Sequence, residues 1–190
     1  ASNGSASLTI TKAATLTTVT CGAGPFIYNG SPYTPCSASV TGPGLSESLT
    51  VTYTNNVNAG TASASASYAE SGNYLSSTHS KTFTIEKASS LTSVTCPASV
   101  PYTGSAIEPC TATVTGIGGL TQSLTVSYAN NVNAGTATAS ATFSGDTNHN
   151  GSADSKTFTI EKAVSTTTVT CPVSVTYNGA AQTPCTAKVT

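Results

Sequence analysis

The chain repeats its own sequence with a period of 75 residues. The octapeptide NNVNAGTA occupies residues 55–62 and, letter for letter, 130–137, and KTFTIEKA occupies 81–88 and 156–163. A fixed period is the signature of a chain built from successive copies of one structural unit. Any fold for this sequence must therefore fit into one period and recur.

The period divides the chain into four segments. We predict a last strand of a preceding repeat at 1–12, repeat 1 at 13–87, repeat 2 at 88–162, and the first strands of a truncated third repeat at 163–190. The linker between the complete repeats holds neither Gly nor Pro, which favours a stiff join. The two partial segments lack the middle of a repeat, so we expect a longer repetitive polypeptide.

Within each repeat, apolar and hydroxyl side chains alternate with the period of two that is typical of β-strands. The clearest cases are GTASASASY at 60–68 and GTATASATF at 135–143, where Ala faces one side and Ser or Thr the other. Several short strands separated by turn residues predict an all-β fold, with one β-sandwich per repeat. Alanine leaves a thin core, so we expect larger residues of the facing sheet to fill it: Tyr28, Leu49, Val51, Tyr53 and Phe83 in repeat 1, and Tyr102, Leu124, Val126, Tyr128 and Phe158 in repeat 2.

The composition excludes several classes of function. Only 7% of the residues are charged and the net charge is −1, whereas nucleic-acid binding needs clustered Lys and Arg. No apolar run approaches the roughly 18–20 residues of a membrane span, so we expect no membrane insertion. The polar residues of the chain are mainly Ser and Thr, which account for 65 of the 190 residues.

Six cysteines fall as one pair per repeat, at equivalent positions. The pairing that respects the repeat joins Cys21 to Cys36, Cys96 to Cys110 and Cys171 to Cys185. Closing a loop of this size stabilises a small domain by about 3 kcal/mol on the chain-entropy model, and paired cysteines indicate an oxidising compartment. Free buried thiols are the alternative. Zinc is disfavoured, because no C-x2-C spacing or recurring His accompanies the pairs.

The order and spacing of these motifs resemble a known family. TITKA, V-x-Y-N/T-G, P-C-T-A-x-V-T-G and the run SLTVSYANNVNAGTATASATFSGDTNHNGSADSKTFTIEKA are similar to the bacterial immunoglobulin-like repeats, including the MBG type, of large secreted or cell-surface adhesins and stalk proteins. The resemblance implies tandem Ig-like β-sandwich domains stacked end to end, and a role as spacer or stalk without catalytic residues or cofactors. This chain differs from many repeats of that family in having a cysteine pair in each repeat.

The titratable residues form no recurring cluster that would indicate an enzyme. His79 occupies the position of Asp154 in repeat 2, and His149 the position of Tyr74 in repeat 1. Because no nucleophile-elbow pattern accompanies them, we predict a chain that is not an enzyme.

The segment DTNHNGSAD places oxygen-bearing side chains at alternate positions, as in a calcium loop, with Gly151 at the sixth. The candidate ligands are Asp146, Asn148, Asn150, Ser152 and Asp154. Only two of them are carboxylates, and Thr157 stands where Glu is required. We therefore interpret the segment as a polar turn and predict no metal site in this chain.

Three N-x-S/T glycosylation motifs begin at Asn3, Asn29 and Asn150. Covalent glycans there, or O-linked sugars on outward hydroxyls, would account for the solubility of a chain with so few charges.

These observations favour a structural segment of an extracellular or cell-surface stalk, fibre or filament. The partners expected are further copies of the same repeat. The alternative function is an adhesin or carbohydrate-binding module that contacts a ligand through its loops. That function predicts aromatic-rich loops in one repeat only, and Tyr33, Tyr74 and His149 offer little of this kind.

Overall fold

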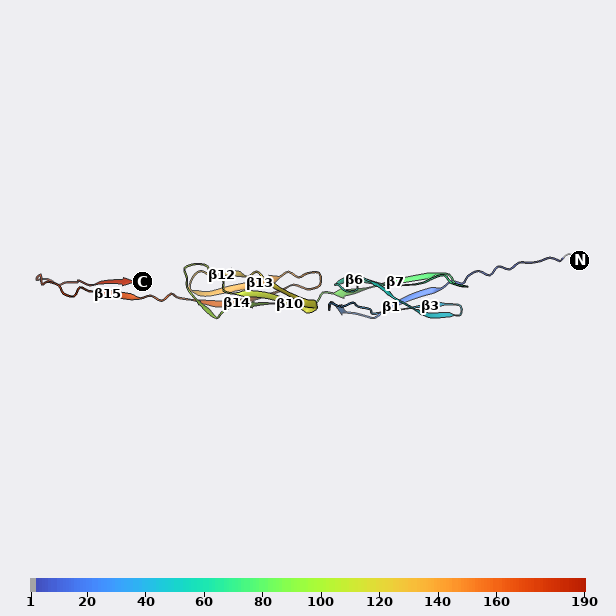
Figure 1. Ribbon diagram of the computed structural model, residues 1–190, viewed down its shortest axis with the longest axis horizontal. Helices are drawn as coiled ribbons and strands as arrows, with labels where there is room; N and C mark the ends of the chain where they lie inside the picture. Colours follow the sequence, from blue (N-terminus) through green and yellow to red (C-terminus); the bar gives the residue numbers. More distant parts are fainter. Residues whose placement is uncertain (1–2) are drawn as a thin grey trace. The chain divides into compact units, whose positions relative to one another are not determined.

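The computed structural model describes residues 3–190, and within them the chain is all-β apart from one 3-10 turn, η1 at Ile117–Gly119 (Figure 1). By its internal contacts the chain forms two compact units. The first holds the residues up to Ser93 together with Ala112–Thr125 and Ala141–Asp154, and the second holds Val94–Thr111, Val126–Ser140 and Ser155–Thr190.

A three-stranded antiparallel sheet forms one layer of repeat 1. Its order is β1-β3-β4, with β1 at Leu16–Cys21, β3 at Cys36–Gly42 and β4 at Leu45–Leu49. The alternation of LTTVTC turns Thr17 and Val19 inward and leaves their neighbours exposed. The register places Cys21 directly opposite Cys36.

A four-stranded sheet forms the other layer. Its order is β2-β7-β6-β5, with β2 at Phe26–Ile27, β5 at Thr52–Thr54, β6 at Gly60–Tyr68 and β7 at Ser77–Glu86. Strand β2 runs parallel to β7, and the other pairs are antiparallel.

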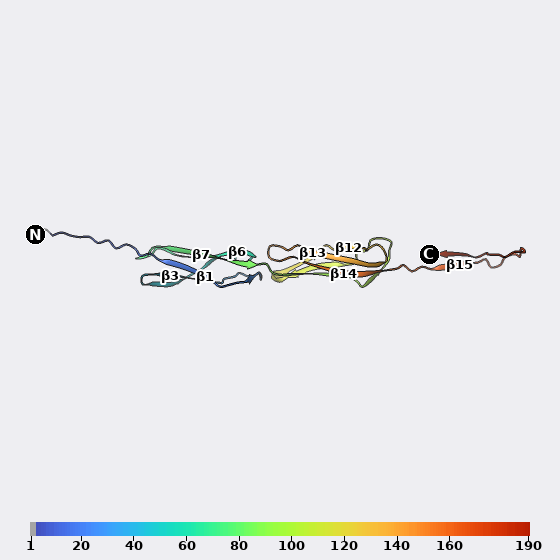
Figure 2. The same cartoon turned by 180° about the vertical axis from the view of Figure 1, so that it is seen from behind.

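The two layers of repeat 1 enclose one hydrophobic core, which is the arrangement of a β-sandwich (Figures 1 and 2). The alanines of β6 are fully buried, as their alternation predicts. The larger residues do not all come from the facing sheet as expected. Phe83 and Tyr53 lie on strands next to β6 in the same sheet, and their longer side chains cover the space beside the alanines.

The strand order recurs in the second half of the chain. One sheet has the order β11-β10-β8, and the other has the order β12-β13-β14-β9. Their bounds are β8 Ser90–Thr95, β9 Ser99–Pro101, β10 Thr111–Gly116, β11 Leu120–Leu124, β12 Ser127–Ala129, β13 Gly135–Phe143 and β14 Ser152–Glu161. Turn η1 is longer than the Pro43-Gly44 turn of repeat 1, because Gly119 is an additional residue there.

The two ends of the described chain hold little regular structure. Strands β15 (Thr167–Thr170) and β16 (Thr186–Val189) form an antiparallel pair whose side chains are all exposed. Residues 3–12 form no strand among the described residues, and Leu8 and Ile10 are exposed. In residues 3–190, no helix is long and apolar enough to cross a bilayer.

Candidate functional site

Three disulfides tie the strands together at equivalent positions. They join Cys21 to Cys36, Cys96 to Cys110 and Cys171 to Cys185, the pairs that the repeat predicts. The described part of the chain holds no free cysteine and no group of three or more His, Cys, Asp or Glu that could bind a metal. Three disulfides indicate folding in an oxidising environment.

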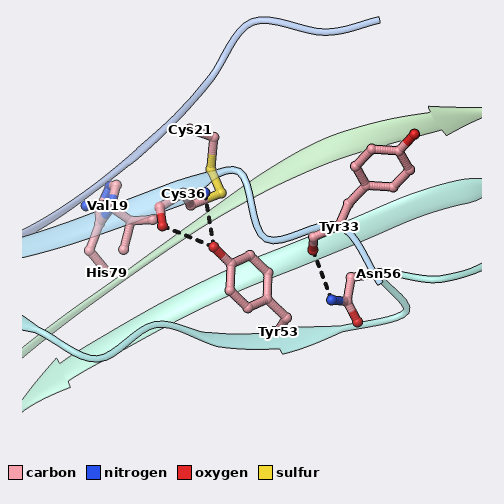
Figure 3. Close-up of a disulfide and its surroundings, with 7 residues drawn as sticks. All are labelled: Val19, Cys21, Tyr33, Cys36, Tyr53, Asn56 and His79. Carbon is pink, nitrogen blue, oxygen red and sulfur yellow. Dashed lines mark hydrogen bonds between the residues drawn. A yellow bond between two sulfur atoms is a disulfide. The ribbon is translucent and has the colours of Figure 1, made fainter. Parts of the chain in front are cut away.

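A tyrosine hydroxyl braces each of the first two disulfides. The backbone N–H of Cys36 donates to Tyr53 Oη at 2.9 Å, and that hydroxyl donates to the Cys36 carbonyl at 2.9 Å (Figure 3). Tyr128 makes the same two bonds to Cys110 at 2.9 and 3.1 Å. Sequence reasoning treated both tyrosines only as core residues. A Tyr follows the second cysteine at a similar distance in each complete repeat, and this recurrence could have indicated a contact between the two residues.

The two asparagines that open the repeated octapeptide have separate roles. Asn55 and Asn130 adopt the left-handed backbone conformation, with φ of 56° and 59°, which Asn tolerates better than most residues. Asn56 donates its side-chain amide to the Tyr33 carbonyl at 2.8 Å (Figure 3). Asn131 does the same to Ile107 at 3.2 Å. These bonds fix the shape of the loop in each repeat.

Several candidate ligands of the calcium-like segment bind partners within the protein. Asp146 Oδ1 accepts the backbone N–H groups of Asn148 and His149 at 2.7 and 2.6 Å, so it closes a turn. Ser152 Oγ lies 2.8 Å from the hydroxyls of both Ser90 and Thr92. Asn150 donates to the Lys87 carbonyl at 3.4 Å. These contacts are those of a polar turn.

The same segment contributes to a group of residues from both repeats, all within the first compact unit. We call this group the junction cluster, and it comprises Tyr28, Asn58, Ile117, Gly118, Asp146, Asn148 and His149.

Asn148 bonds directly to the repeated octapeptide of repeat 1. Its Oδ1 accepts the Ala59 backbone N–H at 2.9 Å, and its Nδ2 donates to Asn58 Oδ1 at 3.1 Å. The side-chain amide of Asn148 in repeat 2 therefore forms hydrogen bonds to repeat 1 through both its oxygen and its nitrogen.

Tyr28 contacts two parts of repeat 2. Its ring centroid lies 5.3 Å from that of His149 in an edge-to-face geometry, and its ring lies against Gly118. A Cβ atom at Gly118 would lie 2.7 Å from Tyr28 Oη, so a side chain at this position would displace the Tyr28 ring. Tyr28 is 9% exposed, whereas its counterpart Tyr102 is 39% exposed.

His149 is the buried centre of the cluster, with 4% of its surface exposed. Its Nδ1 lies 3.0 Å from both carboxylate oxygens of Asp146, and its Nε2 lies 2.8 Å from the Ile117 carbonyl oxygen. Burial lowers the pKa of His149, but the hydrogen bonds to Ile117 and Asp146 outweigh it, and the pKa is raised. Desolvation of Asp146 raises its pKa, and the hydrogen bonds from His149 and Asn148 reverse that effect, so its pKa is lowered.

Tyr74 stands at the His149 position in repeat 1. Its hydroxyl donates to the Pro43 carbonyl at 2.7 Å, which corresponds to the contact of His149 with Ile117. The backbones match as well, since Tyr74 bridges Ala13 and His149 bridges Ala88. Tyr74 in repeat 1 and His149 in repeat 2 thus make equivalent contacts with different side chains.

The glycosylation motifs lie at exposed asparagines. Asn3, Asn29 and Asn150 are all exposed, and Asn29 Oδ1 accepts the Ser31 backbone N–H at 2.9 Å in a turn. The remaining histidine has a structural partner, because His79 Nδ1 accepts the backbone N–H of Val19 at 3.0 Å.

A scan against models of known protein families matches none of them, and a search of curated proteins finds no match.

Proposed function

We propose that this chain is a non-catalytic structural segment of a tandem array, in which Ig-like β-sandwich repeats of about 75 residues stack end to end as a rigid extracellular stalk or fibre. The observation that carries the proposal is the junction cluster. There, Asn148 and His149 of repeat 2 contact Asn58, Ala59 and Tyr28 of repeat 1.

The direct contact of Asn148 with Asn58 and Ala59 supports this function because the residues that make it recur in the sequence. Asn58 and Ala59 lie in an octapeptide that recurs unchanged, and Asn73 stands in repeat 1 where Asn148 stands in repeat 2. Each repeat thus carries the residues for a contact with the repeat before it and another with the repeat after it. Repeat proteins derive their stiffness from such contacts between neighbours.

Relaxation of backbone ¹⁵N nuclei in the 190-residue chain tests the proposal. We expect repeats 1 and 2 to share one rotational diffusion tensor, and Asn148→Ala to make them reorient separately. Asn73→Ala is the matched control, because it removes the exposed equivalent residue. Independent reorientation of the two repeats in the unmodified chain would refute a rigid stalk.

The extracellular setting is tested by the mass of native material. We expect a gain of two hydrogens per disulfide on reduction, and additional mass on peptides that carry Asn3, Asn29 or Asn150 if glycans cover the surface. Free thiols in native material would contradict an extracellular location.

A further inference from the structure

We propose that His149 is a pH-sensitive clamp, which in its protonated form holds loop 146–150 of repeat 2 against repeat 1 and on losing its proton loosens that contact. The inference rests on the proposed function, because it concerns the regulation of the same junction cluster.

The first argument is the hydrogen-bond geometry of the ring. Both nitrogens face acceptors only: the Asp146 carboxylate at Nδ1 and the Ile117 carbonyl at Nε2. A neutral imidazole carries one N–H, so it satisfies one of these partners and turns a lone pair toward the other. The charged imidazolium donates to both. The observed contacts are therefore those of the protonated side chain.

The second argument is charge pairing in a buried place. A buried cation needs an opposite charge and hydrogen bonds, and Asp146 supplies both. The linker before β8 contributes Lys87, whose Nζ donates to the Asp146 backbone carbonyl. The β2 side contributes the ring of Tyr28, and turn η1 presents the Ile117 carbonyl and no titratable side chain.

The third argument links the ring to the junction. Asn148, which bonds to Asn58 and Ala59, is the residue immediately before His149. Asp146, which holds the ring, also accepts the Asn148 backbone N–H. A shift of the ring away from Ile117 or Asp146 must therefore move the loop that carries the contact with repeat 1.

The pH window follows from the directions of the two pKa shifts. The pKa of His149 is raised above its ordinary value of 6.5, so the clamp is complete below 6.5 and is lost as the pH rises through the raised value. The pKa of Asp146 is lowered from 3.8, so its contribution is present above 3.8 and is lost as the pH falls through the lowered value. The clamp is complete between these two ordinary values.

The repeated sequence provides an internal reference for the test. The Ala59 amide donates to Asn148, and Ala134 occupies the same place in the identical octapeptide of repeat 2. Because their neighbours in sequence are the same, the ratio of their hydrogen-exchange rates cancels the intrinsic effect of pH. The matched variant is His149→Tyr, which copies the Tyr74 arrangement of repeat 1.

We expect Ala59 in the unmodified chain to lose about tenfold of its protection relative to Ala134 for each pH unit between 6.5 and the raised pKa of His149, with no further loss above that pKa. In His149→Tyr the ratio should not change between pH 5.5 and 8.5. A ratio independent of pH in the unmodified chain overturns the clamp and leaves the junction intact. Equal exchange of Ala59 and Ala134 at every pH overturns the junction, and the proposed function with it.

A second measurement does not depend on the variant. Long-range ¹H–¹⁵N spectra of the imidazole should show both nitrogens of His149 protonated at pH 5.5, each with the shift of an N–H group. A neutral tautomer at that pH would overturn the proposal, whatever the fate of His149→Tyr.

Discussion

At the scale of single residues, Tyr53 binds both backbone groups of a half-cystine. Tyr53→Phe removes the hydroxyl that accepts the Cys36 N–H and donates to its carbonyl. Because both groups are only partly exposed, we expect a loss of about 1–3 kcal/mol in the free energy of unfolding. Urea denaturation with the disulfides intact measures it.

The control for this prediction is Tyr68→Phe. The Tyr68 hydroxyl contacts Ser71 Oγ at an exposed place, so we expect a change within about 0.5 kcal/mol. Equal effects of the two substitutions would show that the Tyr53 hydroxyl does not brace the disulfide.

Alanine substitutions at Gly118 and Gly44 distinguish the cost of backbone strain from the cost of steric crowding. Both have φ of 72°, so alanine at either position costs about 1 kcal/mol through its backbone alone. At Gly118 the added Cβ would lie 2.7 Å from Tyr28 Oη, whereas at Gly44 the nearest atom is 3.8 Å away. We therefore expect Gly118→Ala to be the more destabilising and to shift the Tyr28 ring resonances. Similar stabilities of the two variants would contradict the packing of Tyr28 on turn η1.

At the scale of elements, alternation predicted the buried faces of the longest alternating strands. The serine and alanine pattern of β6 and β13 predicts which face of each strand is buried, and the structure follows it. The pairing of Cys21 with Cys36 was also predicted from the repeat, and it agrees with the register that places these two residues opposite each other. Period and spacing carry this information because they depend on residues close in sequence.

The junction cluster was not predictable in the same way. His149 lies 121 residues from Tyr28 in sequence, and no pattern within one repeat indicates that they meet. The polar segment that contains Asp146 also matched the spacing of the first nine positions of a calcium loop, although Thr157 stands where Glu is required. Only the tertiary contacts show that Asp146 faces His149 and that Asn148 faces Asn58. Comparison of the repeats identifies His149 as the residue that replaces Tyr74, but it does not indicate which residues His149 contacts.

The disulfides of the two complete repeats should stabilise their sheets to similar degrees. Replacing Cys21 and Cys36 with serine reopens a loop of 15 residues between β1 and β3, and we expect a loss of about 2–4 kcal/mol. The same change at Cys96 and Cys110 should cost a similar amount. Chemical denaturation of each double variant measures both.

The third pair is the control for these variants. Strands β15 and β16 bury no side chain, so replacing Cys171 and Cys185 should leave the unfolding of the rest unchanged. If this change destabilised the chain as much as the other two, the two-stranded sheet would have to pack against a core.

At the scale of the whole molecule, two lysines in the same local sequence report whether the loop of repeat 2 holds the linker between the repeats. Lys87 and Lys162 end the same KTFTIEK sequence, so trypsin meets the same local chemistry at both. Ala88, which follows Lys87, is 3% exposed, and its backbone bonds to Asn148 and Asn150 at 2.9 and 2.8 Å. Ala163, which follows Lys162, is exposed.

Trypsin should therefore cut after Lys162 well before it cuts after Lys87. A protease needs several residues of extended chain in its cleft, so cleavage after Lys87 requires the loop of repeat 2 to release Ala88 first. We expect a difference of at least about tenfold in rate, which corresponds to an opening free energy of about 1.4 kcal/mol, followed by mass spectrometry of a time course. Asn148→Ala should narrow the difference and Asn73→Ala should not, because only Asn148 bonds to repeat 1. Equal cleavage at the two lysines in the unmodified chain would mean that the two repeats are joined by an open linker, and the stalk would then lack its stiffness.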